Sequence, residues 1–303
     1  MSQKTKIAFT SCMRYQAYPV QPQWLSIEAE NPDYLFLLGD QIYMDFGIIG
    51  DTKNGAPECF SDGKFESEMN RHYENQWNEP NFKKLFGKMK AKSAVFGIWD
   101  DHDFAWNNAF GNSVCESKKI ISRRMFHQWM GCSTNLPEIY CHIDIPHARV
   151  IFLDTRYYAD SPGTSPRKLL GSKQFDFLEQ SLNHNSQYTI ICSGITLTHG
   201  SENWTRFDHD YNRLKALLDD VENVLFLAGD IHANRYSPPD SSRPCHEIVS
   251  SGLAINKLGL PFTGRHNWGI LELDENEVLI NLVDMKKQQR FHIHTGTAEL
   301  RKN

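Results

Sequence analysis

Short apolar runs, each closed by glycine or by an acidic residue, recur along the chain. The clearest is Tyr34–Leu38, which is uninterrupted and is bounded by Pro32 and Gly39. Five residues are too few for an independent helix, and a run without polar alternation is typical of a strand buried on both faces. The pattern therefore predicts an inner strand at 34–38, with Asp40 and Tyr43 just beyond its carboxyl end.

The same pattern predicts further strands, and several of them run directly into aspartate. The predicted strands are 7–10, 34–38, 95–99, 139–145, 149–153, 189–192, 224–228, 246–249, 269–273, 278–283 and 291–294. The last three alternate between apolar and polar residues, which is typical of antiparallel strands joined by short turns. The earlier strands are separated by helical patterns, which favours an α/β fold with parallel strands.

Apolar residues at helical spacing predict the helices between these strands. The predicted helices cover 21–30, 82–92, 114–130 and 210–218, and a further one, capped by Ser172, runs to Leu182. Between 46 and 81 both patterns break down, so we expect a loop or lid insertion there, partly helical toward its end. A solvated insertion without function fits this stretch equally well.

Length and charge set bounds on the kind of protein. The 303 residues are 40% hydrophobic, enough for one large core, and we expect a single domain over 1–303. The net charge of -5, from 32 Lys+Arg and 37 Asp+Glu, predicts neither a nucleic acid nor an anionic membrane as partner. The start of the chain lacks a signal peptide and no run is long enough to span a bilayer, which predicts a cytoplasmic protein.

The cysteines argue against a disulfide or zinc-ribbon framework. The chain has 7 cysteines, an odd number, and no C-x-x-C pair. Most of them are expected to be small buried core residues. Cys12 differs because it directly follows the first predicted strand.

Carboxylates at successive strand ends indicate a cation site. A charge buried at the rim of a core costs several kcal/mol unless it is paired or metal-bound. Two-metal hydrolysis needs a carboxylate that bridges ions about 3.5–4 Å apart, and Asp40 is our candidate for it. Tyr43 is placed to ligate through its phenolate, which would favour ferric iron, although packing beside the strand end explains it too.

Two further strand ends carry histidine. Asp230 and His232 are two residues apart, so both point the same way from an extended segment, as metal ligands or as an ordinary hydrogen-bonded pair. His102, within the run 100–103, is a candidate general acid oriented by a carboxylate, unless that run is a solvated face. Arg156 and Arg235 lie just beyond strand ends, where each could clamp phosphate or pair with an acidic neighbour.

Taken together, these motifs resemble the alkaline phosphatase D (PhoD-like) family of the calcineurin-like metallophosphatases. The motifs, in chain order, are Ser11-Cys12, Gly39-Asp40-Gln41-Ile42-Tyr43, Trp99-Asp100-Asp101-His102-Asp103, Leu153-Asp154-Thr155-Arg156 and Gly229-Asp230-Ile231-His232. Secreted members carry a twin-arginine signal and an N-terminal domain, which this sequence lacks, so we expect an intracellular substrate.

The resemblance implies a fold and a metal site. The fold would be a four-layer αββα sandwich of two mixed sheets, and the metals ferric iron plus calcium, with manganese, magnesium or zinc as other candidates for the second ion. The residues implied for iron are Cys12, Asp40, Tyr43 and His232. Those implied for the second ion are Asp40 and Asp230, completed by Asp101 or Asn107. His102 would be the acid or a transition-state contact, and Arg156 and Arg235 would contact phosphate.

The sequence thus leads to the hypothesis of a metal-dependent phosphoric-ester hydrolase in which a metal-bound hydroxide attacks phosphorus in line. The substrate would be a phosphate-ester small molecule or a phosphodiester, and both monoesters and diesters stay open. One rival is a phosphatase with an aspartyl nucleophile at Asp154. The other is a binding scaffold of the same fold with an inactive site. The oligomeric state is left open.

Overall fold

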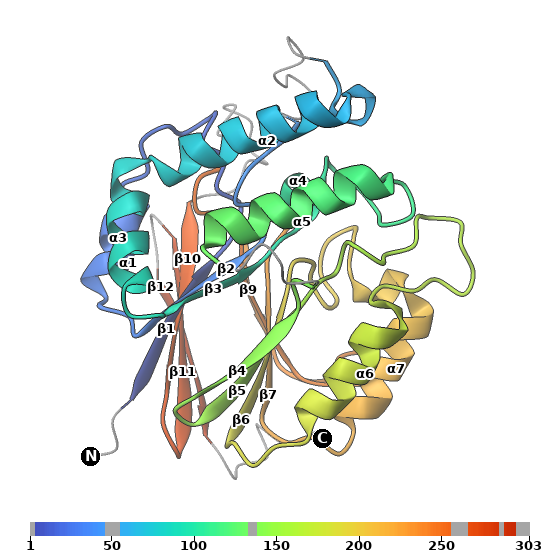
Figure 1. Ribbon diagram of the computed structural model, residues 1–303. Coiled ribbons are helices and arrows are strands. Elements are labelled where there is room, and N and C mark those ends of the chain that lie inside the picture. Colours follow the sequence, from blue (N-terminus) through green and yellow to red (C-terminus); the bar gives the residue numbers. More distant parts are fainter. Residues whose placement is uncertain (1–3, 46–54, 133–137, 256–265, 285–287, 295–303) are drawn as a thin grey trace.

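The protein folds into two β-sheets that face each other, with helices on both outer sides (Figure 1). The computed structural model describes residues 4–45, 55–132, 138–255, 266–284 and 288–294. Both sheets contain parallel and antiparallel strands. The predicted α/β class and the four-layer αββα sandwich of two mixed sheets are therefore confirmed.

The first sheet has the strand order β12-β11-β10-β1-β2-β3. Its parallel part consists of β1 (Thr5–Thr10), β2 (Tyr34–Leu38) and β3 (Val95–Ile98). Its antiparallel part consists of β10 (Asn267–Leu273), β11 (Glu277–Asp284) and β12 (Gln288–His294), as their alternating patterns predict.

The second sheet has the order β4-β5-β6-β7-β9-β8. Its parallel strands are β5 (Ala148–Leu153), β6 (Tyr188–Ser193), β7 (Val224–Ala228) and β9 (His246–Ser250). The edges are antiparallel: β4 (Cys141–Ile145) and β8 (Asn234–Ser237). The sequence does not predict β8, because an edge strand of polar residues carries little hydrophobic signal.

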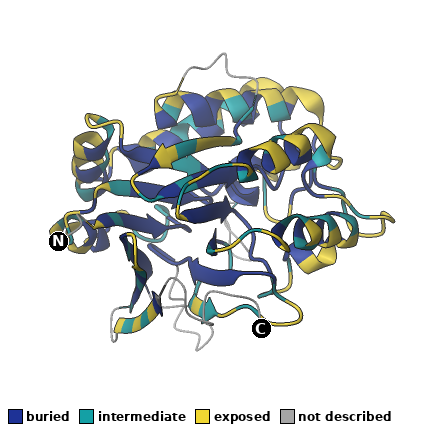
Figure 2. Ribbon diagram, turned by 90° about the horizontal axis from the view of Figure 1, so that it is seen from below, coloured by how far each residue is buried: buried dark blue, intermediate teal, exposed yellow. Residues whose placement is uncertain are grey.

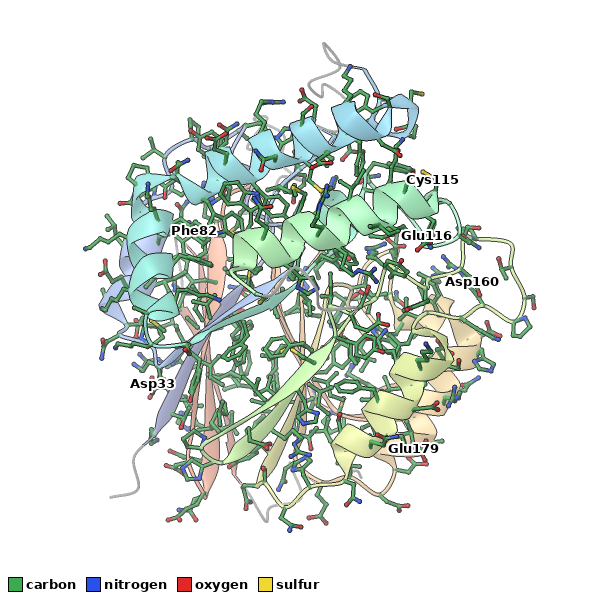
Figure 3. All side chains as sticks on the ribbon, viewed as in Figure 1. Asp33, Phe82, Cys115, Glu116, Asp160 and Glu179 are labelled. Atoms are coloured by element: carbon green, nitrogen blue, oxygen red, sulfur yellow. The ribbon has the colours of Figure 1, made fainter. Side chains whose placement is uncertain are left out.

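Helices cover the outer face of each sheet (Figure 1). Those over the first sheet are α1 (Gln23–Ala29), α2 (Asp62–Trp77), α3 (Pro80–Lys90) and α5 (Glu116–Met130). Those over the second are α6 (Gly171–Leu182) and α7 (Asp208–Leu218). The short elements are α4 (Asp101–Phe104) and the 3-10 turns Pro57–Cys59 and Trp204–Arg206. Figure 3 labels Glu116, where α5 begins, with Cys115 before it.

Alternating side chains along the inner strands build the layers. In β2, Leu35 and Leu37 pack against the helices, whereas Phe36 and Leu38 pack against the second sheet. Apolar residues of period two in a strand contribute to two cores at once. Figure 2 shows the result, with buried strands inside and exposed residues on the outer sides of the helices. In the described ranges, no helix is both long and apolar enough to cross a membrane.

The segment 46–81 is more helical than the predicted insertion, for which we expect helix only toward the end. Its described part is mainly the 16-residue helix α2. Phe65, Met69 and Tyr73 of α2 are fully buried in the hydrophobic core that the helices form on the outer face of the first sheet. Residues 46–54 lie outside the described part, so the lid expectation is not tested there.

Two smaller expectations are wrong. Ser172 is not the cap of α6, because Leu170 holds the N-cap position without a side-chain hydrogen bond. All seven cysteines are free, but Cys59, Cys115, Cys132 and Cys141 are exposed instead of buried. Cys12 is fully buried.

Candidate metal centre

The carboxyl ends of the parallel strands of both sheets meet at one end of the sandwich. Gly229, after β7, has almost no room beside it, since a Cβ there would lie 2.4 Å from the Leu38 carbonyl oxygen of β2. It would also lie 2.8 Å from Ser11 Oγ, after β1. The close approach of these backbones brings residues that follow β1, β2 and β7 into contact.

Four of the predicted ligands share an unusual backbone conformation. The φ angles are 60° for Cys12, 55° for Asp40, 74° for Asp230 and 54° for His232. Residues other than glycine rarely adopt positive φ, which costs about 1–3 kcal/mol each, and such strain concentrates at functional sites. Hydrogen bonds from Cys12 N to Gly39 O (3.3 Å) and from Met13 N to Asp40 O (2.8 Å) hold two of these turns against each other.

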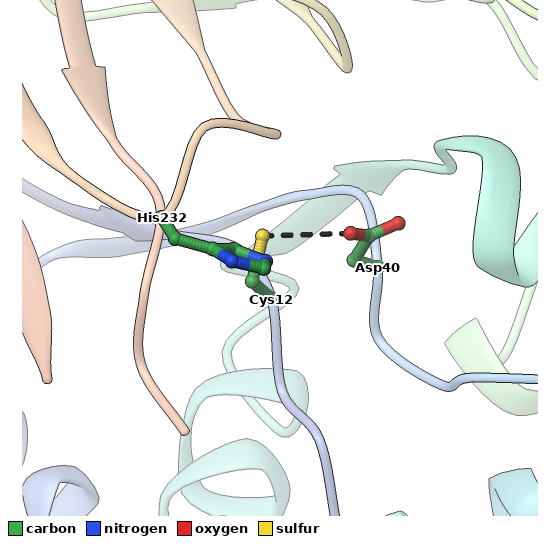
Figure 4. Close-up of side chains that lie close together, drawn as sticks. All are labelled: Cys12, Asp40 and His232. Carbon is green, nitrogen blue, oxygen red and sulfur yellow. Dashed lines mark hydrogen bonds between the residues drawn. The ribbon is translucent and has the colours of Figure 1, made fainter. Parts of the chain in front are cut away.

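The first group of donors contains Cys12, Asp40 and His232, whose candidate ligand atoms all lie within 4.8 Å of one another. The Cys12 thiol donates to Asp40 Oδ2 at 3.5 Å (Figure 4). Tyr43 adds a phenol oxygen, 3.0 Å from Asp40 Oδ2 and 3.4 Å from His232 Nε2. The structure therefore brings together all four residues predicted for the iron site.

A second group of donors contains Asp40, Asp101 and His102, again with candidate ligand atoms within 4.8 Å. Asp40 thus belongs to both groups, as a bridging carboxylate must. Its Oδ1 is buried and accepts no hydrogen bond from the described residues. A buried carboxylate oxygen without a donor is costly unless a cation occupies the space beside it. The donors in this structure therefore fit two neighbouring metal ions.

The raised pKa values of the buried carboxylates also favour bound cations. Burial raises the pKa of Asp40 well above its usual value, and Asp101, Asp100 and Asp103 raise it further against the opposing effect of His102. Burial also raises the pKa of Asp230, and the nearby charges of Asp100 and Asp101 raise it further. So many carboxylates hold their charge together only when positive charge compensates them, which bound cations would supply.

His102 is oriented by Asp45, whose Oδ1 lies 2.6 Å from His102 Nδ1. The other oxygen of Asp45 accepts the backbone N–H of Asn107 at 2.8 Å. Burial lowers the pKa of His102, but Asp101, Asp40 and Asp45 outweigh it and raise that pKa to about 10. Its imidazole is therefore stabilised as the cation, which is the form that a general acid needs.

The remaining predicted ligands differ in their placement. Asp101 belongs to the second donor group, and its two oxygens also accept the backbone N–H groups of His102 (2.9 Å) and Asn108 (2.5 Å). Asn107 is exposed. The carboxylate of Asp230 is in neither donor group, although its carbonyl oxygen lies 3.8 Å from Cys12 Sγ.

The two predicted phosphate contacts lie in very different surroundings. Arg156 is 1% exposed, and its Nε donates to Asp100 Oδ1 at 2.5 Å while its Nη1 lies 3.1 Å from Glu202 Oε2. Arg235 is exposed on the edge strand β8, where its Nη1 donates to Asn234 O at 3.0 Å. Arg156 thus forms the structural ion pair that was its alternative role, and phosphate contact stays a prediction for both.

Asp154, the nucleophile of the rival hypothesis, has a structural role. It is 1% exposed, and its Oδ1 accepts hydrogen bonds from Trp99 Nε1 (2.7 Å) and from the backbone N–H groups of Arg156 (2.9 Å) and Tyr157 (3.0 Å). A carboxylate oxygen with three donors and no solvent access is poorly placed to attack a phosphate ester.

Three residues near the site receive no role of their own from the sequence, although Asp103 lies within the run 100–103. Asp45 orients His102, and Asp103 accepts the backbone N–H groups of Asp40 (3.2 Å), Gln41 (3.2 Å) and Asp100 (2.6 Å). The guanidinium carbon of Arg14 lies 4.4 Å from the centre of the Tyr43 ring. Asp45 and Arg14 each lie two residues from a predicted ligand, and that proximity is the signal that could have identified them.

Comparisons with known proteins agree with this picture. The sequence model of the PhoD-like phosphatase family matches residues 7–268. No curated protein matches the chain. Among solved structures, a dimetal phosphatase from Danio rerio has a TM-score of 0.56 at 12% identity, over 94% of this chain and 98% of that one.

Two more solved structures are less similar. The protein TT1561 of Thermus thermophilus has a TM-score of 0.45 at 9% identity, over 95% of this chain and 99% of that one. A 5'-nucleotidase from Candida albicans has 0.44 at 11%, over 99% of this chain and 54% of that one. At 12% identity, the likeness to the Danio rerio structure shows a shared fold alone. The other two structures, with TM-scores below 0.5, support no conclusion about this chain.

Proposed function

The chain belongs to the PhoD-like phosphatase family and is a metal-dependent phosphoesterase, and we propose that it works with two metal ions held at the strand ends. The observation that carries the proposal is the pair of donor groups that share Asp40. We also propose that residues 1–303 act as one domain.

For the first ion we propose ferric iron, held by Cys12, Asp40, Tyr43 and His232. The support is chemical: a thiol, a phenol, an imidazole and a carboxylate converge on one point. Calcium and magnesium take oxygen ligands and are not expected to use a cysteine. The phenol favours a highly charged ion, because it ligates as the phenolate.

For the second ion we propose calcium, with manganese, magnesium or zinc as further candidates, held by Asp40 together with Asp101 and Asp230. Asp101 is preferred over Asn107 because it belongs to the same donor group as Asp40; the third member of that group, His102, is assigned as the acid and not as a ligand. Asp230 is included because Asp100 and Asp101 act on its pKa, so that it lies on the acidic side of the cluster. Oxygen donors suit a hard divalent ion.

Two such ions, when bound, activate water for attack on phosphorus and neutralise the charge that develops. The protein's own part begins with His102, which Asp45 holds in one orientation. Asp101, Asp40 and Asp45 favour the protonated form of His102, in which it can donate its proton to the leaving oxygen of the ester. Arg156, beneath the site, keeps the Asp100 carboxylate paired and so limits repulsion among the acidic residues.

The alternative of an inactive scaffold is less consistent with the site. An inactive member has no need for buried donors that converge on a cation, or for four proposed ligands held at positive φ. Both features are present here. They are costly to the fold, and ion binding gives them a purpose.

The test is hydrolysis of p-nitrophenyl phosphate and bis-p-nitrophenyl phosphate before and after removal of metal. We expect turnover of at least one ester, its loss on chelation, and its return when iron and a divalent ion are added together. Turnover that is unaffected by complete metal removal would contradict the proposal, as would a metal-loaded protein that hydrolyses neither ester.

A further inference from the structure

Arg14 lies against Tyr43, a predicted ligand, and its backbone is held by hydrogen bonds. It follows Cys12 by two residues, and its backbone N–H donates to Ala254 O at 2.8 Å. Its carbonyl oxygen accepts the N–H groups of Ala17 and Tyr18, each at 3.1 Å. The turn is therefore tied down on both sides, and the half-buried guanidinium stands over the Tyr43 ring, 4.4 Å from its centre.

The Tyr43 ring connects Arg14 to the reacting region. The ring packs against the imidazole of His102, with 4.1 Å between the ring centres. Its hydroxyl reaches Asp40 and His232. Arg14 and the candidate acid thus contact the same aromatic ring, which belongs to a predicted ligand of the first ion.

The other two candidate arginines are less suited to an incoming phosphate. Arg156 is almost completely buried and forms ion pairs with Asp100 and Glu202. Arg235 extends from the exposed edge of the second sheet. Arg14 is the one of these three that is both half-buried and in contact with Tyr43, a predicted ligand of the first ion.

We propose that Arg14 binds a non-bridging oxygen of the substrate's phosphoryl group and selects doubly charged phosphomonoesters over singly charged phosphodiesters. The inference rests on the proposed function. A guanidinium makes charge-assisted, often bidentate hydrogen bonds to phosphate oxygens. A monoester dianion has three such oxygens and two charges, whereas a diester has two and one, so a third cation beside two metal ions favours the monoester.

The experiment compares Arg14→Met, which removes the charge and keeps an unbranched apolar stem, with Arg14→Lys, which keeps the charge. Arg213→Met is the matched control, because Arg213 also stacks on an aromatic ring, 4.0 Å from the centre of Phe175, on the far helical layer. We would measure kcat/KM for p-nitrophenyl phosphate and for bis-p-nitrophenyl phosphate, metal content, and inhibition by inorganic phosphate.

We expect Arg14→Met to lower kcat/KM for the monoester at least about tenfold more than for the diester, as loss of a charge-assisted bond to the dianion implies. Inhibition by phosphate should weaken in parallel, with the metal content unchanged. Arg14→Lys should recover part of the monoester preference, and Arg213→Met should leave the ratio of the two substrates as it is.

Equal loss for both esters, or no loss, would overturn the role of Arg14, as would a greater loss for the diester. Equal loss together with reduced metal content would show that Arg14 merely supports Tyr43. These outcomes are distinct from failure of the proposed function, in which the unaltered protein shows no metal-dependent hydrolysis of either ester.

Discussion

Single residues at the strand ends could be predicted because each directly follows an apolar run. Cys12, Asp40 and His232 are adjacent to strands whose carboxyl ends lie at one edge, and the structure brings their ligand atoms within 4.8 Å. The partners of these residues could not be predicted in the same way. Asp45 contacts His102 across 57 residues, and only the fold shows that the two meet.

The Asp45 contact leads to a prediction for Asp45→Asn. Asp45 both orients the His102 ring and helps raise its pKa. His102 is protonated at pH values below its raised pKa. Loss of Asp45 lowers that pKa, so the protonated form that acts as the acid is lost at a lower pH than in the parent. We expect kcat to fall about tenfold or more and the basic limb of the pH–rate profile to move to lower pH. Steady-state kinetics from about pH 6 to about pH 10 would measure both.

A surface aspartate provides the control. Asp144 is exposed and pairs with Arg149 on the β4–β5 hairpin, so Asp144→Asn makes the same chemical change away from the site. This variant should retain the unaltered profile. If Asp45→Asn lowers kcat without moving the basic limb, Asp45 positions His102 but does not tune its acidity.

At the level of elements, the sequence predicts the strands well where burial imposes a continuous apolar run. The prediction is incomplete for α2, because helix is expected only toward the end of 46–81 although Phe65, Met69 and Tyr73 have helical spacing. They are separated by many charged and polar residues on the exposed face, and the undescribed stretch before them carries no periodic pattern. A one-sided helix with mostly polar residues is easily mistaken for a loop.

The close packing of strand ends makes Gly229 a test at the same scale. A Cβ there would lie 2.4 Å from the Leu38 carbonyl oxygen and 3.0 Å from that of Gly194, and these backbone atoms cannot move without shifting β2 or the segment after β6. We expect Gly229→Ala to destabilise the protein by about 1–3 kcal/mol, with a fall in Tm of several degrees, and to reduce metal binding. Thermal unfolding and metal content of the purified variant measure these effects.

Gly63 of α2 is the matched position for comparison. A Cβ at Gly63 meets nothing within 4 Å, so Gly63→Ala should leave both Tm and metal content unchanged or slightly raise the Tm. A Gly229→Ala protein as stable and as metal-rich as the parent would show that the two sheets have room to separate at this edge.

For the whole molecule, the alternation of apolar residues predicts the layers but not how the two sheets are placed. The site depends on that placement, because Cys12 and Asp40 follow strands of the first sheet and His232 follows a strand of the second. Nothing local in the sequence states that β7 ends beside β2. The resemblance of the motifs to a known family supplied that part, and the fold confirms it.

If two ions share the Asp40 carboxylate, removing it should release both, so we would measure the metal content per chain of the protein and of its Asp40→Asn variant. Both should be purified without chelator and analysed by elemental mass spectrometry, with Asp144→Asn as control. Because Asp40 belongs to both donor groups, we expect two ions per chain in the parent and in the control, and loss of both in Asp40→Asn. An Asp40→Asn protein that still holds two ions would contradict the shared site.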